Sequence, residues 1–145
     1  MTNLSYYLLP LIWFQAPYAS VRGPLIRLRL DDNTNPRLCL DRLEKSGKYS
    51  PRLIAKLRRR ESCEKNVWEG MPMILAAIVA GNAVGLSERF MNTVSIGYFV
   101  LRCAYIWSYI NIETKPASFI RSVLWWGCNF CSFTTFVKAG MALNK

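Results

Sequence analysis

Residues 70–87 have the sequence GMPMILAAIVAGNAVGLS, a run without a single charged side chain. A helix that crosses a lipid bilayer needs about 20 predominantly apolar residues. Small residues recur through this run, at Ala76, Ala77, Ala80, Gly81, Ala83 and Gly85. Small side chains allow the backbones of neighbouring membrane helices to approach closely. The run therefore predicts a transmembrane helix that packs tightly against other helices.

Three further runs are also long, apolar and almost free of charge. Residues 2–21 and 122–137 carry no charge, and residues 90–112 carry only one, at Arg102. No basic residues precede the first run, which favours a retained helix over a cleaved signal peptide. We therefore expect an all-α integral membrane protein, a single domain over residues 1–145 that forms a four-transmembrane-helix bundle. The expected helices cover about 2–21, 60–86, 89–112 and 118–141, since each is long enough to span.

The positive charge of the chain is concentrated in one segment. The formal net charge is +10, and 13 of the 19 Lys and Arg residues lie between Arg22 and Lys65, with only six Asp and Glu residues. Basic loops beside spanning helices lie on the cytosolic side, where they contact anionic lipid headgroups. Residues 22–59 are therefore expected to form a basic cytosolic loop, with both termini on the opposite side. Two short amphipathic stretches are expected around 37–46 and 51–61, and the second runs into the second spanning helix. This distribution argues against nucleic acid as a partner, although basic proteins often bind it.

Neither a metal site nor a disulfide framework is expected. The chain contains no His, so a catalytic zinc site is not indicated. The five Cys residues are scattered and odd in number, which argues against a set of disulfides. Cys128 and Cys131 form a C-x-x-C pattern inside an apolar run. Redox chemistry is one interpretation of this pattern, and two small residues on one helix face are the favoured one.

Polar residues within the apolar runs fall on helical stripes. Ionisable groups inside spanning segments are costly, so they mark either a functional site or a packing contact. One stripe, at helical spacing, consists of Arg59, Ser62, Asn66 and Glu69. A second consists of Arg102, Tyr105 and Tyr109, and Arg121 opens the fourth run.

The three groups are expected to meet near the cytosolic boundary, where they suit a small anionic ligand. Arg binds carboxylates, and Tyr and Asn make directional hydrogen bonds. The alternative is a structural pair, such as Glu69 with Arg102, that only ties helices together.

The same residues resemble a known family. The segment Asn66-Val-Trp-Glu69-Gly-Met-Pro72 has the N-x-x-E-x-x-P pattern of the MAPEG family (membrane-associated proteins in eicosanoid and glutathione metabolism). The segment from Arg102 to Tyr109 resembles that family's R-x-x-Y-x-x-x-Y pattern on the third helix, and Arg121 its Arg at the start of the fourth. Four short segments are similar to sequences of fungal MAPEG-like proteins: residues 32–37, 80–86, 109–111 and 136–140.

The resemblance implies a homotrimer that binds glutathione between protomers near the cytosolic face. Carried over by position, Asn66, Glu69, Tyr105 and Tyr109 would contact glutathione. Arg102 and Arg59, which lie on the same stripes, are the further expected cofactor-binding residues. The catalytic residues would be Arg121 and Tyr109, with Arg121 stabilising the glutathione thiolate as a nearby cation should. One position departs from the family, because Ser62 stands where members usually have the Arg that grips a glutathione carboxylate. This departure weakens the expected glutathione site unless Arg59, on the same stripe, replaces the missing cation.

The expected function is that of a membrane enzyme acting on a lipophilic small molecule. A tailoring step in secondary metabolism is the leading interpretation: glutathione-assisted conjugation, as in a glutathione S-transferase, or an isomerisation or cyclisation. Ser62 favours a variant that works without glutathione, in which the cleft residues supply acid–base and electrostatic help directly. The alternative is a non-enzymatic lipid-binding scaffold of the same family. A multi-pass protein of the endoplasmic reticulum is the expected localisation.

Overall fold

The computed structural model describes residues 2–144, and these residues form helices and no strands. The expected all-α class is therefore confirmed. The elements in chain order are α1 (Ser5–Ala19), α2 (Arg22–Arg27), the short 3-10 helix η1 (Pro36–Leu38), α3 (Cys39–Ser46), α4 (Pro51–Ala83), α5 (Glu88–Asn111) and α6 (Phe119–Leu143).

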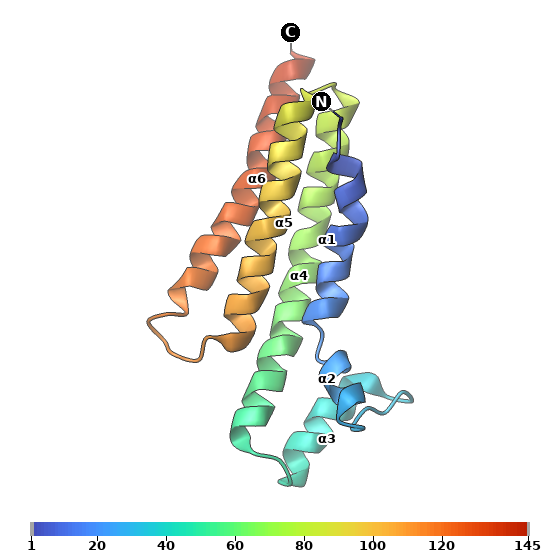
Figure 1. Cartoon of the computed structure of the whole chain (residues 1–145), viewed down its shortest axis with the longest axis vertical. Coiled ribbons are helices and arrows are strands. Elements are labelled where there is room, and N and C mark those ends of the chain that lie inside the picture. Colours follow the sequence, from blue (N-terminus) through green and yellow to red (C-terminus); the bar gives the residue numbers. More distant parts are fainter. Residues whose placement is uncertain (1, 145) are drawn as a thin grey trace.

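The long helices α1, α4, α5 and α6 lie side by side along the longest axis of the molecule (Figure 1). Helix α4 packs against each of the other three, and α5 also packs against α1 and α6. The N- and C-terminal ends lie together at one end of the bundle, whereas α2 and α3 lie at the other (Figure 1). This arrangement separates the termini from the basic segment, as the charge pattern predicts.

The core of the bundle is a cluster of buried apolar side chains drawn from all four long helices. It includes Ile12 of α1, Ile78 of α4, Met91 of α5 and Cys128 of α6, each at most 3% exposed. Gly81 of α4 allows the closest approach, because a Cβ built there would meet side chains of α5 and α6 within 3 Å. Gly81, together with the fully buried Ala77, thus serves close helix packing, whereas Ala76, Ala83 and Gly85 are exposed.

Helix α4 begins before the expected boundary at residue 60 and includes the amphipathic stretch around 51–61, which was expected to run into it. Its first residue is Pro51 instead of residue 60, and the hydroxyl of Ser50 accepts a hydrogen bond from the backbone N–H of Leu53. A serine cap followed by proline in the first turn is a strong helix-start signal. The expected loop at 22–59 is therefore wrong as a description of local structure, because α2, η1, α3 and the first turns of α4 occupy most of it. A second buried cluster, formed by Leu25, Cys39, Leu40 and Leu57, holds these short helices together.

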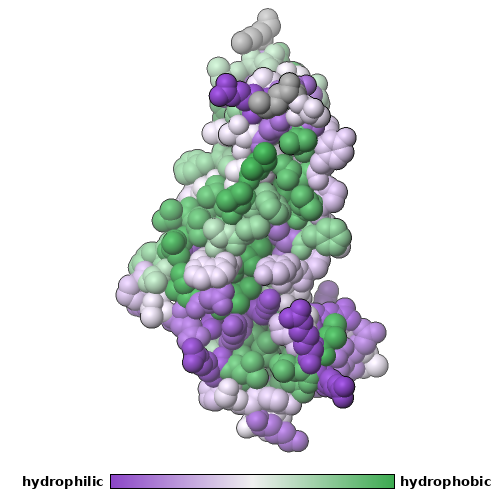
Figure 2. Space-filling view, viewed as in Figure 1, coloured by the Kyte–Doolittle hydropathy of each residue, from purple (hydrophilic) through white to green (hydrophobic). Residues whose placement is uncertain are grey.

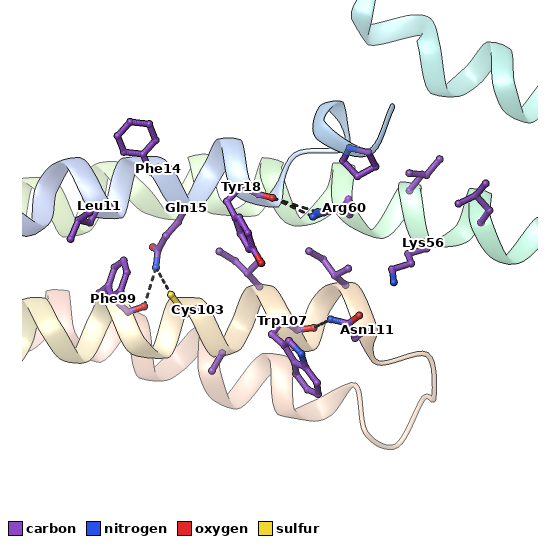
Figure 3. A pocket seen from close by; sticks show the side chains of 16 residues that line it. Leu11, Phe14, Gln15, Tyr18, Lys56, Arg60, Phe99, Cys103, Trp107 and Asn111 are labelled. Carbon is purple, nitrogen blue, oxygen red and sulfur yellow. Dashed lines mark hydrogen bonds between the residues drawn. The ribbon is translucent and has the colours of Figure 1, made fainter. Parts of the chain in front are cut away.

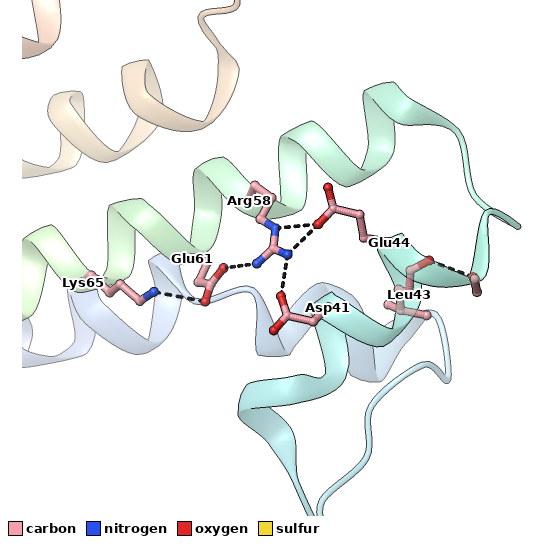
Figure 4. Close-up of polar contacts among 7 residues, drawn as sticks. Asp41, Leu43, Glu44, Arg58, Glu61 and Lys65 are labelled. Atoms are coloured by element: carbon pink, nitrogen blue, oxygen red, sulfur yellow. Dashed lines mark hydrogen bonds and ion pairs between the residues drawn. The ribbon is translucent and has the colours of Figure 1, made fainter.

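A group of charged side chains joins α3 to α4. The guanidinium of Arg58 donates hydrogen bonds to Asp41 and Glu44 of α3, both at 2.5 Å, and to Glu61 at 3.1 Å (Figure 4). Lys65 in turn donates to Glu61 at 3.1 Å. Opposite charges at this spacing stabilise the contact between the two helices, although only modestly where water reaches them.

The outer surface of the bundle is rich in large apolar side chains. On α6, more than half of the surface of Phe119, Val123, Phe130 and Val137 is exposed. Figure 2 shows hydrophobic residues gathered along the middle of the molecule, above a more hydrophilic end that carries α2 and α3. A continuous apolar surface of this kind marks contact with lipid or with another protein.

Within residues 2–144, none of the helices is long and apolar enough to cross a membrane. Polar side chains inside the expected spans, such as Asn92, Ser95 and Arg102 of α5, lower their hydropathy. The four transmembrane helices therefore stay a prediction.

Candidate functional site

A cleft of about 570 Å³ opens beside α4, α5 and α6, near the turn that joins α5 to α6. Four of the residues singled out in the sequence line it, one from α4, two from α5 and one from α6: Asn66, Tyr105, Tyr109 and Arg121. Part of each stripe therefore meets here, Asn66 from the first and Tyr105 and Tyr109 from the second, beside Arg121. The remaining lining residues are Ser118, Phe119, Ser122, Trp125 and Trp126.

Arg121 lies in the first turn of α6 and faces α5. Its guanidinium carbon stands 4.7 Å from the centre of the Tyr109 ring, and its Nε donates to the backbone oxygen of Ser118 at 3.3 Å. The rings of Tyr109 and Tyr105 are 5.5 Å apart between their centres. A cation over an aromatic face is attracted by the ring, which holds the charge in one orientation. Arg121 thus presents a fixed positive charge beside two phenol groups.

Arg102 lies behind the cleft and is only 1% exposed. One of its terminal nitrogens donates to the backbone oxygen of Asn66 at 2.5 Å and to the side-chain oxygen of Asn66 at 3.0 Å. Its guanidinium carbon stands 4.6 Å from the centre of the Tyr105 ring. Gly70 leaves room for this group, because a Cβ at that position would lie 3.3 Å from the same terminal nitrogen. Arg102 therefore fixes the positions of two lining residues.

No carboxylate of residues 2–144 pairs with Arg102, and its buried Nε has no hydrogen-bond partner there. The alternative of a structural pair between Glu69 and Arg102 is wrong for the single chain, since Glu69 is exposed and does not line the cleft. A buried cation held by neutral oxygens and an aromatic ring keeps most of its charge uncompensated. Arg102 and Arg121 together make the cleft electropositive.

Arg59 is directed elsewhere. Its Nε donates to the backbone oxygen of Ile110 at 3.1 Å, and a terminal nitrogen donates to Glu113 at 2.9 Å. Arg59 therefore ties the N-terminal part of α4 to the end of α5 and the residues after it, and does not line the cleft. The expected replacement for the missing Arg at position 62 is not provided by this side chain, and Ser62 itself is exposed.

The aromatic wall of the cleft went unpredicted. Trp125 and Trp126 are in contact, with ring centres 5.0 Å apart, and Trp126 also contacts Phe130 at 5.8 Å. Trp125 follows Arg121 by four residues, so both lie on the same face of α6. This spacing was present in the sequence and could have identified the wall.

The fold and the cleft define a class of protein: a helical bundle with a cationic, aromatic-walled site for a small anionic or polarisable group at one end. The MAPEG family model matches residues 6–141, nearly the whole chain. The chain therefore belongs to the MAPEG family and is a membrane protein of the type found in glutathione and eicosanoid metabolism. No curated protein and no solved structure gives a significant match.

Members of this family commonly use glutathione. The cleft fits the thiol part of that tripeptide, because the cation of Arg121, held over the ring of Tyr109, would stabilise a thiolate. It fits the carboxylates less well, because Arg59 is engaged by Glu113 and position 62 carries no charge.

Proposed function

We propose that this protein is a membrane enzyme that acts on a lipophilic small molecule, with the cleft beside α4, α5 and α6 as its catalytic site. The observation that carries the proposal is the guanidinium of Arg121 held 4.7 Å above the ring of Tyr109 inside this cleft. The tryptophan wall offers apolar surface to a substrate next to this charge.

Arg121 and Tyr109 are the proposed catalytic residues. A fixed cation stabilises negative charge that develops in a transition state, and a phenol donates or accepts a proton. Asn66 and Tyr105 orient the bound molecule, since both line the cleft and both are held by Arg102. Arg102 acts as a positioning residue, because it lies behind them and is buried.

Glutathione is the proposed cofactor and supplies a thiol nucleophile when bound. Arg121 would face the sulfur and lower its pKa, while Asn66 and Tyr105 would contact the peptide. Glu69 is exposed on the protomer surface, which suits a role completed by a second copy in a homotrimer. The proposed reaction is conjugation, isomerisation or cyclisation as a tailoring step in secondary metabolism, carried out by a multi-pass protein of the endoplasmic reticulum.

One observation favours a second candidate, a lipid-binding scaffold without catalytic activity. Neither Arg59 nor Ser62 offers a cation for a glutathione carboxylate in the single chain. The same observation favours an enzyme in which the cleft binds substrate without glutathione. The two differ in whether Arg121 and Tyr109 are required for turnover.

Glutathione binding to the detergent-purified chain tests the proposal, by calorimetry and by thermal shift. We expect saturable binding that Arg121→Ala and Asn66→Ala each abolish. Arg89→Ala is the matched control, because Arg89 is an exposed arginine at the opposite end of α5. It should bind glutathione as the native protein does.

The absence of binding in folded protein would remove glutathione from the proposal. Turnover that survives Arg121→Ala combined with Tyr109→Phe would remove these two residues from the catalytic mechanism. The absence of any turnover by folded native protein would leave the scaffold.

A further inference from the structure

Three consecutive arginines of α4, Arg58, Arg59 and Arg60, are directed toward three different neighbours. Arg58 binds two carboxylates of α3 (Figure 4). Arg60 donates to the backbone oxygen of Tyr18 at 3.4 Å, in a groove between α1, α4 and α5 (Figure 3). Arg59 turns instead toward the end of α5, where its Nε donates to the backbone oxygen of Ile110 at 3.1 Å. Of the three, Arg59 is therefore the one that contacts the end of α5 at which the cleft opens.

The guanidinium of Arg59 lies at the margin of the cleft. Ile110, whose backbone oxygen it contacts, directly follows Tyr109, and Tyr109 lines the cleft beside Arg121. The turn between α5 and α6 then leads to Ser118, which also lines the cleft. Only 20% of the Arg59 side chain is exposed, so its charge is screened less than that of a free surface arginine. A ligand group that extends past Tyr109 toward this turn would therefore meet the charge of Arg59.

One carboxylate occupies this cation. Oε1 of Glu113, two residues after the end of α5, accepts a hydrogen bond from a terminal nitrogen of Arg59 at 2.9 Å. The same oxygen lies 3.7 Å from Nε of Arg52 in the first turn of α4. Arg52 and Arg59 are seven residues apart, which is about two turns, so both lie on the face of α4 that meets this carboxylate. Within residues 2–144, no other carboxylate pairs with Arg59.

We propose that Glu113 is an autoinhibitory group of the cleft: its carboxylate occupies Arg59, and a carboxylate of the bound ligand competes with it for this cation. The inference rests on the proposed function, since glutathione carries such carboxylates and Ser62 provides no cation for them. Arg52 gives Glu113 a second partner, so Glu113 keeps a cation when Arg59 binds the ligand. Both arrangements are ion pairs in contact with water, so they differ little in free energy.

A purely structural role of the contact is the competing explanation. In that case the pair between Arg59 and Glu113 only fastens the turn between α5 and α6 to α4 and keeps Ser118 in place. The two roles differ in the sign of one effect. If Glu113 is autoinhibitory, loss of its charge strengthens the binding of a ligand that carries a carboxylate. If the contact is structural, loosening of the turn weakens every ligand of the cleft.

Calorimetry of glutathione and of its diethyl ester, with the full chain in detergent, tests the proposal. Glu113→Gln removes the negative charge and keeps the size of the side chain. We expect this variant to bind glutathione about fivefold more tightly than the native protein does, which is the order that one partly exposed ion pair contributes. The diethyl ester has no free carboxylate, so both proteins should bind it equally. Asp31→Asn is the matched control, because it removes an exposed negative charge that does not pair with Arg59, and it should leave both affinities unchanged.

Arg59→Met identifies the cation through a double-mutant cycle. In the Arg59→Met background, Glu113→Gln should no longer strengthen the binding of glutathione, since two groups in direct contact are coupled. A gain that persists in this background would assign it to another cation and overturn the inference.

Equal binding of glutathione by the native protein and Glu113→Gln would also overturn the inference, as would weaker binding of both ligands by the variant. Either result leaves the proposed function standing, provided that the native protein binds glutathione and Arg121→Ala does not. The absence of glutathione binding by the native protein and by Glu113→Gln alike would overturn the proposed use of glutathione and this inference with it.

Discussion

At the residue scale, Gly81 shows how little space separates α4 from its neighbours. A Cβ there would lie 2.7 Å from the sulfur of Met91 and 2.9 Å from the Cγ2 of Thr135, which is fully buried. Met91 is flexible, whereas the β-branched Thr135 cannot turn aside easily. We expect Gly81→Ala to lower the free energy of unfolding by about 1–3 kcal/mol, as overpacking does. Thermal unfolding in detergent measures it.

Gly97 supplies the matched control for that substitution. It lies inside α5, and a Cβ at this position would meet nothing within 4 Å. Alanine favours a helix over glycine by about 1 kcal/mol, so Gly97→Ala should unfold at the same or a higher temperature. Equal destabilisation by the two substitutions would show that the close contact at Gly81 does not limit the packing of α4.

Helical spacing predicted which site residues share a helix face, but not which partners their side chains contact. Asn66, Tyr105 and Tyr109 were assigned to stripes from their spacing, and all three line the cleft. Arg59 lies on the same stripe as Asn66, yet its side chain donates hydrogen bonds to Glu113 and to the backbone oxygen of Ile110. Those partners depend on how α4 packs against α5, and spacing within one helix does not contain that information.

At the element scale, the contact between α3 and α4 depends on Arg58. Its pairs with Asp41 and Glu44 are exposed to water, so they stabilise the contact only weakly. We expect Arg58→Met to leave the four long helices folded and to increase hydrogen exchange in α3. Arg37→Met, at an exposed arginine of η1, is the control and should not change the exchange. Unchanged protection of α3 in Arg58→Met would assign the contact to the apolar cluster around Leu40.

The same contact should depend on pH. The hydrogen bond from Arg58, and then its charge, lower the pKa of Asp41 below the ordinary value of 3.8. A carboxyl whose pKa is lower in the folded state stabilises that state above its unfolded pKa, and the stabilisation is lost as the pH falls through the folded value. The protection factor of the α3 amides, which removes the intrinsic pH dependence of exchange, should therefore be constant at neutral pH and fall only below the ordinary pKa of Asp41. A fall already near pH 6 would contradict this assignment.

At the scale of the whole molecule, the helical class followed from the long charge-free runs, whereas the structure of the basic segment did not. The amphipathic stretches expected around 37–46 and 51–61 match α3 and the first turns of α4, but no long apolar stripe runs through residues 22–59, so their packing was not predictable. They fold because Leu25, Cys39 and Leu57 form a small cluster of their own, and Arg58 adds charge pairs across it. Both depend on tertiary contacts between short helices that are too short to be stable alone. The homotrimer likewise stays a prediction, since it concerns surfaces between copies.

The separation of charge from the termini leads to a prediction for the whole chain in its membrane. Lys48 lies between α3 and α4, and Asn144 lies at the opposite end of the bundle, beside the N-terminal end (Figure 1). If the basic segment is cytosolic, as the positive-inside rule predicts, a membrane-impermeant maleimide should label Lys48→Cys in sealed microsomes. Asn144→Cys should react only after detergent is added. Both variants carry Cys103→Ser, which removes the exposed native thiol. Equal labelling of both positions in sealed vesicles would mean that the long helices do not cross the bilayer. Labelling of Asn144→Cys alone would mean that the protein has the opposite orientation, with its termini in the cytosol.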